Sequence, residues 1–461
     1  MNMSEISFDP DLIRRYDKAG PRYTSYPTAV QFHEGFAERE YKDVAINSNA
    51  THQPLSLYFH LPFCDTICFY CACNKIVTKN RKHTAPYLQR LFQEIAMQAA
   101  LFDQNRTVTQ LHWGGGTPTF LSHAEMRELM SETRRYFKLL DDDSGEYSIE
   151  VDPREANTET INLLRELGFN RLSLGVQDFE PAVQKAVNRI QSEAITEEVI
   201  QAARASGFHS VSIDLMYGLP LQTVNTFSQT LDKVIAMSPD RLSVFNYAHM
   251  PQMFKTQRQI NESDLPSADE KLNILQLCVQ KLTAAGYVYI GMDHFAKPDD
   301  ELALAQKNGT LYRNFQGYST QSECDLIAMG ITSISKVGDS YCQNVKTIKE
   351  YEERIDNGHL PMFRGIGLTA DDLLRREIIS QLICHFNLDI PRVENQYNIK
   401  FTEYFDVEFS ELEQMQQDGL LNYSSTHMQV LPVGKFLIRN ICMIFDKYLR
   451  ESGEKRFSKV I

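Results

Sequence analysis

The sequence contains no long apolar run. Nowhere in its 461 residues is there a stretch of about eighteen apolar residues, the length that a helix needs to cross a bilayer. The first residues, MNMSEISFDPDLIRRYDKAG, are polar and lack the apolar segment of a secretory signal. We therefore expect a cytoplasmic protein without a membrane partner. Thiols stay reduced in the cytoplasm, so structural disulfides are not expected.

An excess of positive charge is also missing. The 47 lysines and arginines are outnumbered by 60 aspartates and glutamates, which gives a formal net charge of -13. Proteins that bind nucleic acid by neutralising phosphates carry the opposite balance, so we expect no nucleic-acid partner. A negative net charge does not exclude a local basic pocket that binds an anionic small molecule.

Short runs rich in β-branched and aromatic residues recur along the chain, and each is followed by a helical pattern. The clear runs begin at Leu55, Val108, Tyr147, Arg171, Ser210 and Arg241. A seventh, weaker run is YVYIGMDHF from Tyr287. Repeated strand and helix units of this length predict an α/β fold with a parallel sheet, and six or seven units predict an incomplete parallel (β/α) barrel.

From about Gly365 the pattern changes to amphipathic helices around one short pair of strands. The length exceeds that of a single core, and we predict three parts. These are an N-terminal arm over the barrel mouth (1–40), a catalytic barrel (41–364) and a mainly helical, winged-helix-like C-terminal domain (365–461). The modest basic content of the last part favours a lid or packing domain over a DNA-binding module.

Glycine and polar residues fall together at the ends of several predicted strands. Those at or just past a carboxyl end are Cys64, Gly114 to Gly116, Glu150, Gln177, Asp214 and Ala248. That end of a parallel barrel carries the chemistry, whereas the other end carries stability. Glycines alone would only mark loops, but the polar residues recur in register and favour a site. His60 and His112 stand near apolar runs, where single histidines are more often structural.

Four of the nine cysteines crowd into FCDTICFYCACNK, at positions 64, 68, 71 and 73. Zinc sites usually take two ligands from each of two separated pairs, and the sequence has no second cysteine pair or close histidine pair, so zinc fits poorly. A thioredoxin-type site needs a single C-x-x-C at a helix start. Three thiolates from one tight loop suit a cubane iron-sulfur cluster whose fourth iron stays open to another ligand.

Two motifs together resemble the radical S-adenosylmethionine (SAM) superfamily. One is C-x-x-x-C-x-x-C after the first strand, and the other is GGGTP after the second. Further segments resemble the oxygen-independent coproporphyrinogen III oxidases of haem biosynthesis over nearly the whole chain. They include YDKAGPRYTSYPTA, CFYCACNKIVT, SLGVQDF, IDLMYGLP, FNYAHMP, NFQGYSTQ and LTADDLLRREII.

The resemblance implies oxidative decarboxylation of coproporphyrinogen III to protoporphyrinogen IX, in which a 5'-deoxyadenosyl radical initiates the conversion of two propionates to vinyl groups. It also implies one 4Fe-4S cluster, two SAM molecules side by side, a reducing donor such as a flavodoxin-type protein, and a monomeric chain. Two alternatives stay open. One is a haem-binding chaperone of the same superfamily, although such chaperones generally lack the PRYTSYPT arm, and the other is a radical SAM enzyme that acts on haem.

The resemblance assigns the site residues as well. Cys64, Cys68 and Cys71 are the expected cluster ligands, while Cys73 resembles an additional family cysteine that does not ligate and whose role stays open. The expected SAM contacts are Tyr58, Tyr70, Gly115, Gly116, Thr117, Glu150, Gln177, Arg189, Asp214, Ala248 and Ile334.

The chemistry of these residue types agrees with such roles. Glycines let a ligand approach the backbone, and Glu150 and Asp214 can accept hydrogen bonds from ribose hydroxyls or an amine. The arm offers Arg22 with Tyr23 and Tyr26, which either close over the mouth and pair a propionate or belong to a segment pinned to the surface. No general acid or base is assigned, because the cofactor performs the hard chemistry.

Overall fold

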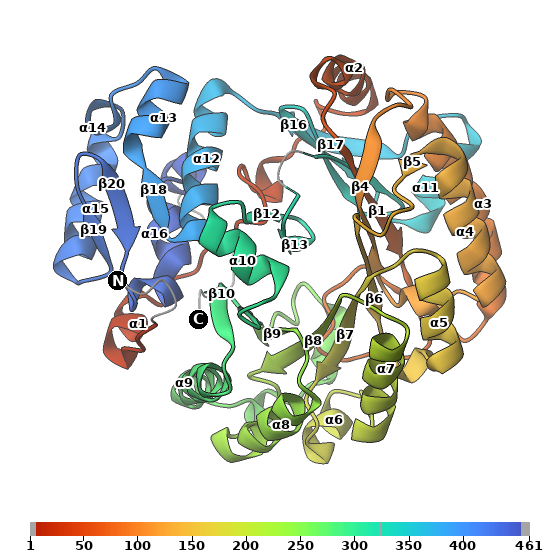
Figure 1. The fold of residues 1–461 in the computed structure, drawn as a ribbon, viewed down its shortest axis with the longest axis horizontal. Helices are drawn as coiled ribbons and strands as arrows, with labels where there is room; N and C mark the ends of the chain where they lie inside the picture. The colour runs from red at the N-terminus through yellow and green to blue at the C-terminus, as the bar shows by residue number, and fades with distance from the viewer. Residues whose placement is uncertain (1–5, 322–323, 453–461) are drawn as a thin grey trace. The chain divides into compact units, whose positions relative to one another are not determined.

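The computed structural model describes residues 6–321 and 324–452, which form two compact units (Figure 1). We call residues 32–267 and 324–367 the sheet unit. Residues 6–31, 268–321 and 368–452 form the helical unit. No helix in either unit, over the described ranges, is long and apolar enough to cross a membrane.

One large sheet forms the centre of the sheet unit. Within this unit its strands follow the order β9-β8-β7-β6-β4-β1-β14-β15-β16-β17, and β5 (Lys138–Leu139) pairs with β4. The bounds in this order are Arg241–Asn246, Ser210–Tyr217, Arg171–Gln177, Glu146–Val151, Thr107–Gly115, Leu55–Leu61, Asp325–Met329, Ile334–Val337, Ser340–Asn344 and Met362–Gly367. From β9 to β14 every pairing is parallel, and from β14 to β17 every pairing is antiparallel. Within the described residues the path stays open, so the predicted incomplete barrel is confirmed.

The helices of the sheet unit follow the predicted alternation with strands. They are α2 (Glu38–Ser48), α3 (Thr84–Ala99), α4 (His123–Tyr136), α5 (Thr158–Glu166), α6 (Pro181–Ala186), α7 (Glu193–Ala205), α8 (Val224–Met237) and α11 (Ile348–Asp356). Figure 1 shows α3, α4, α5, α7 and α8 along the outer side of the strands.

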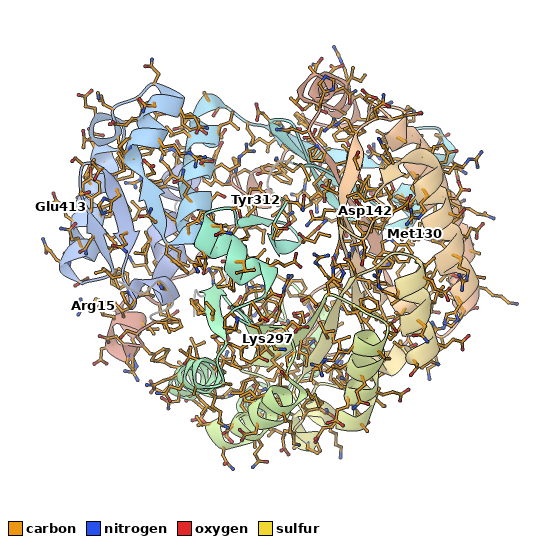
Figure 2. All side chains as sticks on the ribbon, in the orientation of Figure 1. Arg15, Met130, Asp142, Lys297, Tyr312 and Glu413 are labelled. Carbon is orange, nitrogen blue, oxygen red and sulfur yellow. The ribbon has the colours of Figure 1, made fainter. Side chains whose placement is uncertain are left out.

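Helix α4 shows why these segments are helical. Its N-terminus has a capping box: the Ser122 side chain accepts from the Glu125 amide, and the Glu125 carboxylate accepts from the Ser122 amide at 2.8 Å. Met126, Leu129, Met130 and Thr133 are buried at a spacing that forms one apolar stripe. Met130 is 2% exposed, whereas Asp142, in the loop before β6, lies at the surface (Figure 2).

The segment from Tyr287 does contain the predicted strand, but it is not a further parallel strand followed by a helix. It forms β10 (Val288–Gly291) and β11 (His294–Ala296), which pair antiparallel as a hairpin within the helical unit. Gly291 and Met292 have φ values of 139° and 55°, so the chain turns back there. The seventh parallel strand is β14, with the sequence DLIAM, whose five residues are all buried. Because it is a short apolar run without alternation, periodicity does not identify it as a strand.

The helical unit is built from short elements. Its helices are α1 (Pro10–Tyr16), α9 (Ala268–Ala284), α10 (Glu301–Asn308), α12 (Ala370–His385), α13 (Ile390–Tyr397), α14 (Phe401–Tyr404), α15 (Asp406–Gln417), α16 (Ile438–Ile444) and α17 (Lys447–Ser452). β12 (Tyr312–Asn314) pairs with β13 (Gly317–Ser319). β19 (Leu421–Tyr423) and β20 (His427–Val430) are the predicted strand pair, and β18 (Asn387–Asp389) adds a third strand to it. The three-part division of the chain at residues 40 and 364 stays a prediction.

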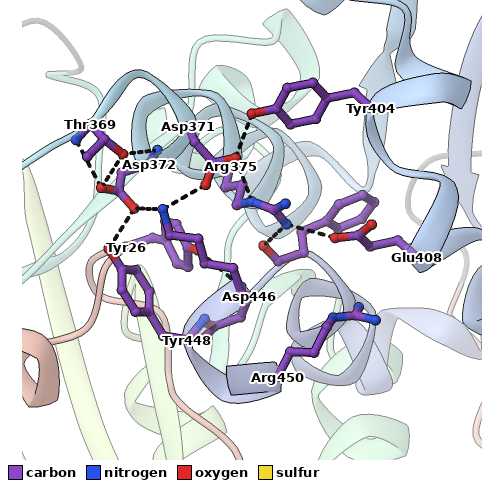
Figure 3. Close-up of polar contacts among 12 residues, drawn as sticks. Tyr26, Thr369, Asp371, Asp372, Arg375, Tyr404, Glu408, Asp446, Tyr448 and Arg450 are labelled. Carbon is purple, nitrogen blue, oxygen red and sulfur yellow. Dashed lines mark hydrogen bonds and ion pairs between the residues drawn. The ribbon is translucent and has the colours of Figure 1, made fainter. Parts of the chain in front are cut away.

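A charged network ties α12 to the last described helix (Figure 3). The ammonium of Lys447 lies 2.7 Å from Asp371 and 2.9 Å from Asp372. One helical turn further, Arg375 pairs with Glu408 at 2.9 Å. Each cation therefore has a carboxylate partner where α12, α15 and α17 meet, which offsets the cost of partial burial.

The same region anchors the N-terminal arm. Tyr23 is 4% exposed and its hydroxyl donates to Asp446 at 3.0 Å, while Tyr26 is 2% exposed and accepts from the Lys447 amide at 3.3 Å. Arg22 forms an ion pair with Asp293 at 2.9 Å. Both tyrosines thus serve as anchors within the helical unit, and contact between Arg22 and a propionate stays a prediction.

A buried carboxyl group connects α3 to the turn after β14. Glu94 is fully buried, and its Oε2 accepts from the Gly330 amide at 2.8 Å and from the Tyr351 hydroxyl at 2.6 Å. Its Oε1 accepts from the Asn344 side chain at 2.8 Å. Burial raises the pKa of Glu94 from 4.5 to about 7, although these bonds lower it in part.

The raised pKa of Glu94 makes stability depend on pH. The folded protein binds this proton more tightly than the unfolded chain, so stability falls as the pH rises from 4.5 to 7, by roughly 3 kcal/mol in all. We expect the melting temperature of the wild type to fall more between pH 5 and pH 8 than that of Glu94→Gln, which cannot ionise. Equal pH dependence of the two melting temperatures would contradict this assignment.

Candidate functional site

The residues expected to hold the cluster and SAM all lie in the sheet unit. Cys64, Gly115 and Gln177 are the last residues of β2 (Phe63–Cys64), β4 and β7. Glu150 and Asp214 stand within the parallel strands β6 and β8, which flank β7. Because β15 runs against β14, its first residue, Ile334, lies at the same edge as the ends of the parallel strands. Gly115 and Gln177 therefore stand at one edge of the sheet, as predicted. Asp214 was predicted at the end of its strand, but it lies inside β8, three residues before the end at Tyr217.

The cysteine loop is fixed at both ends by backbone hydrogen bonds. It runs from β2 to β3 (Ile76–Val77), which pair in parallel. The Thr78 amide donates to the Cys64 carbonyl at 2.9 Å, and the Thr256 hydroxyl donates to the Cys71 carbonyl at 3.0 Å. Segments that are distant in the sequence therefore determine where the sulfur atoms lie.

Two arginines approach the sulfur of Cys68. Nη1 of Arg189 lies 3.6 Å from it and Nη2 of Arg154 lies 3.8 Å from it. Both guanidiniums pair with Asp152, at 3.0 Å and 2.7 Å respectively. Burial opposes ionisation of Asp152, but the arginines outweigh it and lower the pKa of that carboxyl.

The other two cysteines have different surroundings. Burial raises the pKa of the Cys64 thiol to about 11, although the Thr117 hydroxyl, which lies 3.6 Å from the sulfur, lowers this pKa in part. A hydrogen bond from Cys73, together with the nearby ammonium of Lys75, lowers the pKa of Cys71. Cluster and metal ligands are thiolates, so the positive groups at Cys68 and Cys71 fit such a role.

The cysteine loop fits a cluster better than a single ion. Among the described residues no three histidine, cysteine, aspartate or glutamate side chains are grouped to hold one metal ion. A zinc site needs its ligands about 2.0–2.3 Å from one point, whereas a 4Fe-4S cluster distributes its thiolates over different iron atoms. Which cysteines ligate stays a prediction.

The glycine segment packs directly against the start of this loop. The Gly116 amide donates to the Leu61 carbonyl at 2.8 Å, and the Thr117 amide donates to the Phe63 carbonyl at 2.8 Å. A Cβ at position 116 would lie 2.6 Å from the Phe63 oxygen. Gly115 has φ +113°, and a Cβ there would lie 2.8 Å from the His60 ring. The glycines therefore have a packing role in addition to any contact with a cofactor.

Glu150 is an ionised carboxylate with an open face. Its side chain is 45% exposed, while Oε2 accepts from the Gly115 amide at 3.1 Å and Oε1 lies 3.5 Å from His112. Burial of the site would raise its pKa, but His112 and the amide outweigh this and lower it. The carboxylate therefore keeps acceptor capacity for a ligand hydroxyl or amine.

Two histidines contact the predicted residues. His112 stacks on Tyr58 with ring centroids 5.7 Å apart and planes at 10°. His60 lies 3.2 Å from the Tyr58 hydroxyl and 3.0 Å from the Asn74 carbonyl, and burial lowers its pKa. Both were predicted to be structural, although His112 pairs in register with Tyr58, and His60 pairs with Gly114 at the start of the glycine segment. That register was the signal that could have identified them.

The remaining predicted residues occupy the β7 to β9 side. Arg189 is 6% exposed, and its Nε has no hydrogen-bond partner among the described residues. Asp214 accepts from Ser173 at 2.9 Å, and burial raises its pKa to about 6, so it ionises near neutral pH. Gln177 adopts φ +70° at the end of β7. An unpaired buried donor and a poised carboxyl group are typical of ligand sites.

Gln257 was not predicted, and it links two predicted residues. It is 1% exposed, and its amide nitrogen donates to the Tyr70 carbonyl at 3.0 Å and to the Ala248 carbonyl at 3.2 Å. Ile334 lies apart from this group, on β15, where it pairs with Gln343. Nothing in the local sequence around Gln257 signals these bonds, because they depend on the tertiary fold.

A Gly116→Ala substitution tests the backbone contact at the loop. The added methyl group would overlap the Phe63 oxygen, which cannot move as a flexible side chain does. We expect a loss of roughly 1–3 kcal/mol, seen as a lower melting temperature. Gly367→Ala is the matched control, because a Cβ there would meet only Phe36 at 3.7 Å. A Gly116→Ala protein as stable as this control would contradict the contact.

Comparisons with known proteins agree with this geometry. The family model for the Radical SAM superfamily matches residues 58–234, and that for the HemN C-terminal domain matches residues 368–437. The oxygen-independent coproporphyrinogen III oxidase of Pseudomonas aeruginosa is 53% identical over 459 residues, and that of Escherichia coli is 49% identical over 462 residues, each with 100% coverage of both chains.

A solved structure gives the same result. The coproporphyrinogen III oxidase (HemN) of Escherichia coli, described as a radical SAM enzyme, matches with a TM-score of 0.92 and 48% identity. The match covers 96% of this chain and 100% of that one. Identity of this order over the full length shows that the protein belongs to the oxygen-independent coproporphyrinogen III oxidases, a family of radical SAM enzymes.

Proposed function

We propose that the protein converts coproporphyrinogen III to protoporphyrinogen IX without oxygen, by oxidative decarboxylation of two propionates to vinyl groups. The observation that supports this most is full-length identity of 53% to a coproporphyrinogen III oxidase, in a chain with the three-cysteine loop at the carboxyl edge of its sheet. The positively charged groups beside Cys68 and Cys71 agree with this activity.

The cluster and SAM supply, when bound, the electron and the 5'-deoxyadenosyl radical that the reaction needs. Cys64, Cys68 and Cys71 are the proposed cluster ligands, and Cys73 is proposed to stay free of it. Tyr58, Tyr70, Gly115, Gly116, Thr117, Glu150, Gln177, Arg189, Asp214, Ala248 and Ile334 are the proposed SAM contacts.

Individual contacts support these roles. The unpaired Nε of Arg189 suits a carboxylate such as that of the methionine part. The open, ionised face of Glu150 suits the amine or hydroxyls. We propose two SAM molecules, since the predicted contacts are distributed over strands from β15 to β9.

The finer parts of the proposal concern partners and location. We propose a reducing donor such as a flavodoxin-type protein, a monomeric state, and a cytoplasmic location. The helical unit and the arm are proposed as covers that exclude water and oxygen from the radical chemistry. Neither a haem-carrying function nor radical chemistry on haem itself is favoured by a specific observation in the described structure.

Anaerobic turnover tests the proposed function. The reconstituted protein, given dithionite, SAM and coproporphyrinogen III, is expected to release carbon dioxide and 5'-deoxyadenosine and to form a product with the mass of protoporphyrinogen IX. Retention of stoichiometric haem without either small product would instead support a haem carrier. A product derived from opened haem would identify the third possibility.

Iron analysis separates the ligands from the additional cysteine. We expect Cys64→Ala, Cys68→Ala and Cys71→Ala to lose most of the about four irons that a cubane cluster holds. Cys73→Ala, the matched control from the same loop, is expected to keep them. Loss of iron only in Cys73→Ala would overturn the ligand assignment.

A further inference from the structure

Asp152 holds two guanidiniums against one sulfur atom. Its Oδ2 accepts from Nη1 of Arg189 at 3.0 Å and from Nη2 of Arg154 at 2.7 Å. The same two nitrogens are the ones that lie 3.6 Å and 3.8 Å from the Cys68 sulfur. The carboxylate and the sulfur therefore share the same pair of donors, and we call these four residues the Cys68 clamp.

The clamp is largely buried and rigidly held. The side chains of Arg189 and Asp152 are 7% and 8% exposed, and that of Arg154 is 19% exposed. Asp152 also caps the short helix after β6, since its Oδ1 accepts from the Arg154 amide at 3.0 Å and from Arg154 Nε at 3.0 Å. Arg154 is thus fixed by three bonds to one residue, unlike a solvated surface arginine.

Such contacts act on the electronics of a metal-bound thiolate. Donors that point at a cysteine sulfur stabilise negative charge on it, and hydrogen bonds to the sulfurs are among the factors that set the reduction potential of an iron-sulfur cluster. A reduced cluster is more negative than an oxidised one, so these donors favour the reduced form.

We propose that Arg154, oriented by Asp152, is a positioning residue that raises the reduction potential of the cluster bound at Cys68. This inference rests on the proposed function, in which Cys68 is a cluster ligand. Arg189 shares the contact, but it is also a proposed SAM contact, so Arg154 separates the effect on the cluster from that on SAM binding.

The test is a redox titration of the reconstituted protein without SAM, followed by electron paramagnetic resonance. We expect Arg154→Gln to shift the midpoint potential of the cluster to a more negative value. Arg154→Lys keeps the charge but not the forked donor, and we expect it to shift the potential in the same direction. Arg127→Gln is the matched control, because that arginine pairs with Glu166 at the surface and should leave the potential unchanged.

Asp152→Asn distinguishes orientation from net charge. Loss of a negative charge alone would make the potential more positive, whereas loss of the anchor for both guanidiniums is expected to make it more negative. Wild-type potentials in both Arg154 variants, or a positive shift in Asp152→Asn, would overturn the proposal. Loss of iron from both Arg154 variants would also overturn it, since the arginine would then be a support for the loop. If Cys68→Ala keeps its iron, the failure lies in the ligand assignment instead.

Discussion

The site depends on one contact between backbones, where the end of β4 meets the chain between β1 and β2. Two amides of the glycine segment donate to carbonyls at Leu61 and Phe63, directly before Cys64. A side chain at position 116 would occupy the space of the Phe63 carbonyl, so the contact requires glycine. The position of the first cysteine is therefore set by the sheet rather than by the loop that carries the other cysteines.

Carboxylates at this edge of the sheet stay ionised because hydrogen-bond and positively charged partners offset the cost of their burial. Glu150 and Asp152 both have lowered pKa values although burial acts in the opposite direction, because His112 and the two arginines stabilise the carboxylates. Burial raises the pKa of Asp214 to about 6, although hydrogen bonds with Ser173 and Ser243 lower it in part. Strands β6 and β8, which flank β7, thus carry one ionised carboxylate with an open face and one that is poised to ionise near neutral pH.

Much of this arrangement could be predicted from the sequence, and the limits have physical causes. Strands β1, β4 and β6 to β9 begin close to the predicted positions, because each is an apolar run followed by a helical pattern. Their carboxyl ends meet at one edge of a parallel sheet, which is why Cys64 and Gln177 could be placed together. β14 was missed because its five residues show no alternation. The segment from Tyr287 is a hairpin rather than one strand because its turn residues, Gly291 and Met292, lie inside the apolar run.

The side-chain contacts that complete the site could not be predicted from local sequence patterns. Gln257 bonds to Tyr70 across 187 residues of sequence, and Arg154 approaches Cys68 across 86. In sequence, Arg154 is an ordinary charged residue after a proline. The hydrogen bonds from Arg154 to the capping residue Asp152 orient its side chain. Strand β6, which precedes Asp152, pairs with β4, and the Gly116 amide after β4 bonds to the segment that leads into the cysteine loop. The glycine contact that positions Cys64 therefore also positions the loop so that two guanidiniums reach Cys68. The positions of the sulfur atoms and the charges around them thus depend on the same contact.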